Sequence, residues 1–131
     1  DPNDSTSRSI TRAAVRVAQD VDASAVIAFT ETGRSARLVA RYRPSMPLMA
    51  FTPNPRVRSQ LALSWGVETF LVPKAASTDD MVRLVDTALQ DIGRATVGEL
   101  LVIIAGVPPG VPGTTNGMRV HRMGAVIPSG I

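Results

Sequence analysis

Hydrophobic and polar positions along the chain follow two different periods. Apolar residues spaced three or four positions apart predict amphipathic helices, and short apolar runs rich in β-branched residues predict strands. The predicted helices cover residues 7–20, 33–43, 54–65 and 77–93, and the predicted strands cover residues 25–30, 47–52, 67–72, 100–107 and 118–127. Because helices and strands alternate, the pattern predicts an α/β fold. We expect a three-layer α/β/α sandwich around a mostly parallel five-stranded sheet, with the last strand antiparallel.

Local signals at the segment ends support these boundaries. Pro44 ends the second helix, and Pro55 lies in the first turn of the third, where a missing amide hydrogen is tolerated. Ser77 can cap the fourth helix, with Asp79 at the positive end of its dipole. Residues 100–107 form the most apolar segment, which predicts a central strand covered on both faces.

Length and composition narrow the class of protein. A chain of 131 residues can bury a core of its own, so we take residues 1–131 as a single domain, with residues 1–8 as a linker or flexible start. No apolar run approaches the roughly 20 residues that a membrane span needs, and the polar start has no signal-peptide pattern. The chain has no cysteine, which excludes disulfides and thiolate metal sites.

The basic residues are almost all arginines, 13 of 14, and the net charge is +3. Two helices carry them at regular spacing: Arg8, Arg12 and Arg16 on the first, and Arg34, Arg37 and Arg41 on the second. These faces can be solvated stripes, intersubunit ion pairs or contacts for an anionic ligand. Five aromatic residues offer little surface for base stacking, so nucleic-acid binding is not favoured.

The loop TETGRS between the first strand and the second helix is the strongest candidate site. In an open α/β sheet, ligands bind beyond the carboxyl ends of the strands, and a helix N-terminus with free amides attracts phosphate. Glycine allows close approach, and the loop offers three hydroxyl groups. The predicted phosphate-binding residues are Thr30, Glu31, Thr32, Gly33, Arg34 and Ser35. The alternative is that Thr32 or Ser35 only caps the helix.

No other segment predicts catalysis or metal binding. His121, the single histidine, lies in an alternating strand, which favours a solvated or interface position. The acids of residues 77–93 are explained by a helix cap and a solvated face. The loop 108–117 fits no nucleotide fingerprint, since its prolines remove amide donors; we expect a stiff loop that closes over a neighbouring site. We therefore assign no catalytic residue and no metal ligand.

Two stretches resemble a known family. TETGRSARLVARYRPSMPLMAFTPNP, residues 30–55, looks like the effector-domain signature of pyruvate kinase, and GTTNGMRVHRMG, residues 113–124, resembles the C-terminal strand of that family. The resemblance covers residues 10–124. It implies the C-terminal regulatory domain of a cytoplasmic glycolytic homotetramer that transfers phosphate from phosphoenolpyruvate to ADP. The barrel and lid domains are absent, so the resemblance implies magnesium and potassium only for the full-length enzyme, and no cofactor or catalysis for this chain.

The resemblance also implies an effector and partners. In the family the activator's phosphate is held by the loop that matches residues 30–35. Members activated by fructose 1,6-bisphosphate tend to carry a basic residue where Glu31 stands, so AMP or a sugar monophosphate is the expected effector. The expected protein partners are the enzyme's own barrel domain and a two-fold mate that pairs with residues 118–123. The alternative is a free-standing phosphate-binding module without kinase activity.

Overall fold

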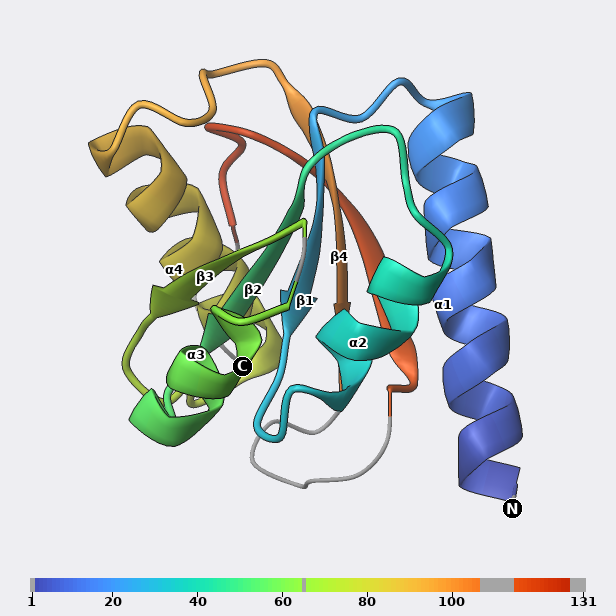
Figure 1. Cartoon of the computed structure of the whole chain (residues 1–131). Coiled ribbons are helices and arrows are strands. Elements are labelled where there is room, and N and C mark those ends of the chain that lie inside the picture. The colour runs from blue at the N-terminus through green and yellow to red at the C-terminus, as the bar shows by residue number, and fades with distance from the viewer. Residues whose placement is uncertain (1, 65, 107–114, 128–131) are drawn as a thin grey trace.

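The computed structural model describes residues 2–64, 66–106 and 115–127, which form one five-stranded sheet with helices on both faces (Figure 1). The helices are α1 (Pro2–Asp20), α2 (Arg34–Arg41), α3 (Pro55–Leu61) and α4 (Thr78–Asp91). The strands are β1 (Ala25–Phe29), β2 (Leu48–Thr52), β3 (Val67–Leu71), β4 (Leu100–Ala105) and β5 (Gly117–Arg122). The predicted α/β/α fold is confirmed.

The strand order β3-β2-β1-β4-β5 places β1 in the middle of the sheet. β1 pairs in parallel with β2 on one side and with β4 on the other, and β5 runs antiparallel to β4, as expected. The chain therefore leaves β1 toward one edge and later returns to its opposite side. This reversal of strand order makes the carboxyl end of β1 the topological switch point, where ligands of open α/β sheets bind.

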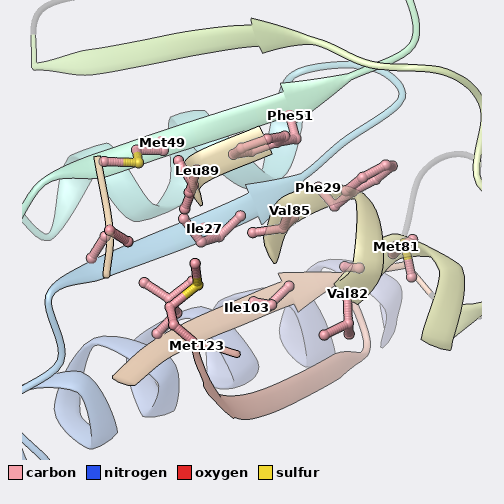
Figure 2. Packing of buried hydrophobic residues seen from close by; sticks show 14 of the residues in the cluster. Ile27, Phe29, Met49, Phe51, Met81, Val82, Val85, Leu89, Ile103 and Met123 are labelled. Carbon is pink, nitrogen blue, oxygen red and sulfur yellow. The ribbon is translucent and has the colours of Figure 1, made fainter. Parts of the chain in front are cut away.

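Of the helices in the described residues, only α4 covers one face of the sheet, and the core on this face is built from large side chains. Because successive strand residues point to opposite faces, Ile27 and Phe29 of β1 face α4 (Figure 2). Phe51 is fully buried and stacks on Phe70 with 4.8 Å between ring centroids. The same cluster includes Met49, Met81, Val82, Val85, Leu89, Ile103 and Met123.

Helices α1, α2 and α3 cover the opposite face, which uses smaller side chains. The fully buried alanines of this face are Ala14 and Ala18 of α1, Ala36 of α2, Ala28 of β1 and Ala50 of β2. Because alanine side chains are small, α1 and α2 pack closely on the sheet, and the two helices lie beside each other (Figure 1). This close packing fixes the start of α2 relative to α1.

Two predicted boundaries differ from the structure. Helix α1 begins at Pro2, so most of the stretch expected as a linker or flexible start, residues 1–8, lies inside it. The reason is a tertiary contact: Ser7 is fully buried, and its Oγ accepts a hydrogen bond from the Thr115 amide at 3.0 Å. Strand β5 ends at Arg122 because the chain turns at Gly124, which has a left-handed φ of 82°. Most of the predicted loop 108–117 lies outside the described residues.

Candidate functional site

The candidate phosphate loop lies at the carboxyl end of β1. The Thr30 amide still donates to the Phe51 carbonyl at 2.8 Å, so the loop starts in register with the sheet. Four residues later the chain enters α2 at Arg34. The loop is therefore short and anchored at both ends, at the switch point between β1 and β4.

Two threonine hydroxyls satisfy amides at the start of α2. Thr30 Oγ1 accepts from the Gly33 amide at 2.8 Å, and Thr32 Oγ1 accepts from the Arg34 amide at 3.3 Å. The first turn of any helix leaves such amides without an intrahelical acceptor. Gly33 is the N-cap of α2 and no side chain caps the helix there, so Thr32 supports the turn from one position before the N-cap and does not act as the expected cap. Each hydroxyl keeps its own hydrogen, which can still be donated to an oxyanion.

Gly33 is required by the backbone of the loop. Its φ of 87° is left-handed, a conformation that other residues adopt only at a cost. A Cβ at this position would lie 3.1–3.3 Å from the Arg37 guanidinium, which folds back over the turn. Arg37 Nη1 also donates to the Thr32 carbonyl at 3.4 Å. The loop is thus covered on one side by a cation from the next helical turn.

Ser35 is placed differently from the threonines. Its side chain is buried, and its hydroxyl contacts the hydroxyl of Thr115, which is also buried. The Thr115 amide in turn donates to Ser7 Oγ at 3.0 Å. This Ser35–Thr115–Ser7 chain joins α2, the segment before β5, and α1. In this structure the Ser35 hydroxyl is engaged in holding these elements together.

Ser7 and Thr115 were not singled out by sequence reasoning. A signal for Ser7 exists, because its position continues the buried stripe of α1 toward the N-terminus. The fully buried residues of that stripe are Ser7, Thr11, Ala14 and Ala18. Thr115 stands in the motif GTTNG, whose composition predicts a loop and gives no sign of burial.

The two charged loop residues complete the site. Glu31 and Arg34 are both half-buried. Arg34 also lines a cavity of about 290 Å³ between α1 and α2, whose other lining residues are Arg8, Arg37, Leu38 and Arg41. The structure therefore brings all six predicted residues to one turn, with Arg34 facing a basic cavity and Ser35 facing the interior.

His121 lies in a second polar cluster on the opposite face, away from solvent. Only 2% of it is exposed, and its Nε2 lies 2.6 Å from Asp86 Oδ2, which also accepts from the Gly124 amide at 2.9 Å. Burial raises the pKa of Asp86, but hydrogen bonds from His121, Gly124 and Gln90 and the charge of His121 lower it further, so the net shift is downward. The expected solvated or interface histidine is wrong, because Asp86 gives the imidazole a buried partner.

Other classes of site have little support within the part of the chain that the structure describes. There, no three or more histidine, aspartate or glutamate side chains gather as a metal site would require. None of the described helices has both the length and the apolar character needed to cross a bilayer. The loop after β1 stays the best-formed candidate.

Comparison with known proteins decides the family. A family model described as "Pyruvate kinase, alpha/beta domain" matches residues 8–121, which include the loop, strands β1 to β4 and all of β5 except its last residue. The chain belongs to the pyruvate kinase family. The resemblance seen in residues 30–55 and 113–124 is confirmed, and the chain is the C-terminal α/β domain of such an enzyme.

Curated pyruvate kinases and solved structures agree with this. The pyruvate kinase of Mycobacterium tuberculosis is 50% identical over 115 residues, covering 88% of this chain and 24% of the relative. That of Corynebacterium glutamicum is 48% identical over 108 residues, covering 82% and 23%. A crystal structure of a pyruvate kinase from Cryptosporidium parvum superposes with a TM-score of 0.79 at 28% identity, over 90% of this chain and 23% of that one. The chain thus spans about a quarter of the length of these pyruvate kinases.

Proposed function

We propose that this chain is the regulatory domain of a cytoplasmic pyruvate kinase, which transfers phosphate from phosphoenolpyruvate to ADP, and that residues 30–35 bind the phosphate of an activator. The observation that carries the proposal is the geometry of the turn formed by residues 30–35. The Thr30 and Thr32 hydroxyls and the Arg37 guanidinium lie at the N-terminus of α2, where the helix dipole adds partial positive charge. The regulatory effect comes from different affinities of the effector for two states of the whole enzyme.

A monophosphate fits this turn better than a bisphosphate. Glu31 places a negative charge in the loop, which costs about 1 kcal/mol beside a phosphate at the effective dielectric of a partly solvated site. An effector with a single phosphate is repelled by Glu31 only once, and it still makes the contacts that the turn offers. AMP and sugar monophosphates are therefore expected ahead of fructose 1,6-bisphosphate.

A second cavity favours AMP among these monophosphates. It has a volume of about 230 Å³ and lies between α4 and strands β4 and β5. Its lining is mostly apolar and includes Met81, Val82, Ile103 and Ala105. Ala105 pairs with Phe29, the residue before Thr30, so this part of the cavity lies toward the same end of the sheet as the loop, on the face that α4 covers. An apolar cavity suits a purine base better than a sugar ring with several hydroxyls.

Titration calorimetry of the 131-residue chain tests this assignment with AMP, ribose 5-phosphate, glucose 6-phosphate and fructose 1,6-bisphosphate. We expect AMP to bind most tightly. Thr30→Val removes one hydroxyl donor and should weaken AMP binding about tenfold, the value of one hydrogen bond to a charged group. Thr69→Val, the same change on β3, serves as the control and should leave it unchanged. Tightest binding of fructose 1,6-bisphosphate, or equal effects of the two variants, would contradict the proposal.

The alternative is a free-standing phosphate-binding module. An intact reading frame four times as long as this chain, as in the relatives that it matches, supports the regulatory domain. In that enzyme, Thr30→Val should weaken activation by AMP and leave basal turnover unchanged. Equal loss of both would indicate a folding defect. The isolated chain should show no kinase activity, and the magnesium and potassium of the full-length enzyme are assigned no ligands in it.

A further inference from the structure

Three buried hydroxyl residues link the candidate phosphate loop to two other parts of the fold. The Ser35 hydroxyl contacts the Thr115 hydroxyl, and the Thr115 amide donates to Ser7 Oγ at 3.0 Å. Ser35 lies in the first turn of α2, Ser7 lies in α1, and Thr115 lies just before β5 begins at Gly117. Thr115 is 80 positions from Ser35 and 108 positions from Ser7, so only the fold brings these groups together.

Of these three residues, Ser35 is the one placed to meet a ligand. It is 6% exposed, whereas Thr115 is 1% exposed and Ser7 is fully buried. Ser35 also lies in the same turn as Thr30, whose hydroxyl accepts from the Gly33 amide. Thr115, being almost wholly buried, can therefore act on a bound phosphate only through Ser35.

Hydrogen-bond chemistry fixes the direction of the contact between Ser35 and Thr115 once an anion binds. A hydroxyl group has one hydrogen to donate and two lone pairs that accept. Either of the two hydroxyls can be the donor in the structure. A phosphate monoester carries up to two negative charges near neutral pH and accepts hydrogen bonds through its oxygens. If Ser35 gives its hydrogen to the phosphate, its contact with Thr115 persists only with Thr115 as the donor.

We propose that Thr115 is a positioning residue of the phosphate site: its hydroxyl donates to Ser35 Oγ, which turns the Ser35 hydrogen toward the phosphate of the effector. This inference rests on the proposed function, because it concerns the same loop. Hydrogen bonds in series polarise one another, and those made to an ionised acceptor are the stronger kind. Thr115 therefore strengthens the bond from Ser35 to the phosphate without touching the phosphate. Ser7 holds Thr115 in place by accepting its amide.

A purely structural role for Thr115 predicts a different result, and Thr11 provides the matched control. Thr11 is fully buried in α1, and its hydroxyl donates to the Ser7 carbonyl at 2.7 Å. Thr11→Val therefore removes a buried hydroxyl from the same region as Thr115→Val does. It leaves intact the contacts that run from Ser7 Oγ through Thr115 to Ser35.

Titration calorimetry of the 131-residue chain with AMP, paired with urea unfolding of each variant, tests the proposal. Thr115→Val keeps the shape of the side chain and removes the donor, so we expect AMP binding to weaken about threefold to tenfold. Thr115→Ser removes a methyl group and keeps the donor, so it should lose stability but bind AMP within about twofold of the parent chain. Thr11→Val should likewise lose stability and keep its AMP affinity. Unchanged affinity in Thr115→Val, or an equal loss in either of the other two variants, would overturn the proposal.

Two further arms locate the effect of Thr115. In Ser35→Ala the link to the phosphate is already removed, so adding Thr115→Val should reduce AMP affinity no further. Additive losses would overturn the inference, because Thr115 would then act by another route. Inorganic phosphate, titrated by phosphorus NMR as a probe without base or sugar, should lose affinity in Thr115→Val by the same factor as AMP. A loss confined to AMP would place the effect away from the phosphate and would also overturn it.

The failure of this inference can be told apart from the failure of the proposed function. If Thr30→Val weakens AMP binding and Thr115→Val does not, the loop binds phosphate and only the role of Thr115 is wrong. If the parent chain binds none of the monophosphates, both are wrong. Should Thr115→Val fail to fold, Ser7→Ala provides the second test, because it removes the acceptor that holds Thr115. It should weaken AMP binding about twofold to threefold, and unchanged affinity would contradict the inference.

Discussion

Single residues of this domain act mainly through hydrogen bonds to partners far away in sequence. The Ser7 hydroxyl accepts a hydrogen bond from the Thr115 amide. The Asp86 carboxylate accepts hydrogen bonds from the His121 imidazole and the Gly124 amide. A buried polar group that lacks its partner costs stability, so these contacts specify how the helices sit on the sheet. The loop of residues 30–35 is held in a similar way, because its threonine hydroxyls accept hydrogen bonds from amides at the start of α2.

Glu99 provides a residue-scale prediction of pH dependence. The Ser24 hydroxyl, followed by the hydroxyl and amide of Thr96, lowers the pKa of Glu99 from 4.5 to about 2. Because the folded pKa lies below the ordinary value, this stabilisation is complete above pH 4.5 and is lost as the pH falls toward 2. Glu99→Gln cannot titrate and should lack this component, so the two unfolding free energies should converge across this window. Urea unfolding at a series of pH values measures it, and parallel profiles would contradict the assignment.

At the scale of elements, the pattern of apolar residues was enough to predict the helices and strands of the fold. Every predicted strand and helix is present, because burial on one or both faces leaves a periodicity that the sequence displays. The loop before α2 could also be predicted as a candidate site, since glycine and hydroxyl residues between a strand and a helix N-terminus are typical of phosphate binding. Contacts such as Ser7 with Thr115, 108 positions apart, leave no local pattern. The cavity between α1 and α2 could not be predicted as a unit, because its lining residues lie on two helices that only the fold brings together.

Gly33 offers a prediction at the junction of loop and helix. Gly33→Ala and Gly93→Ala should each cost about 1–2 kcal/mol in the free energy of unfolding, because both positions have a left-handed φ. A Cβ at Gly93 meets nothing within 4 Å, whereas one at Gly33 must displace the Arg37 guanidinium. Because the end of the Arg37 side chain is flexible and can move at little cost, denaturant unfolding should give similar losses for the two variants, and calorimetry should show weaker AMP binding for Gly33→Ala alone. If the AMP affinity of Gly33→Ala is unchanged, the loop does not take part in AMP binding.

For the whole molecule, β5 is the edge strand that we expect to pair with a second copy. Met118 and Val120 are 39% and 43% exposed, and an apolar edge strand is a ready template for pairing. Val120→Lys should shift the chain from oligomer to monomer in analytical ultracentrifugation. Leu63→Lys adds the same charge after α3, where Leu63 is 89% exposed, and should leave the assembly unchanged. A monomeric parent chain, or dissociation by both variants, would show that β5 is not the interface.

The position of β1 has a consequence for synthesis on the ribosome. β1 lies near the start of the chain, but one of its two neighbours, β4, lies near the end. Until residues 100–105 have emerged, β1, all of whose residues are buried in the folded domain, has one unpaired hydrogen-bonding edge. Long-range parallel pairing of this kind is slow and exposes nascent chains to aggregation. If translation stalls before β4, the released intermediate should therefore be prone to aggregation and should require a chaperone.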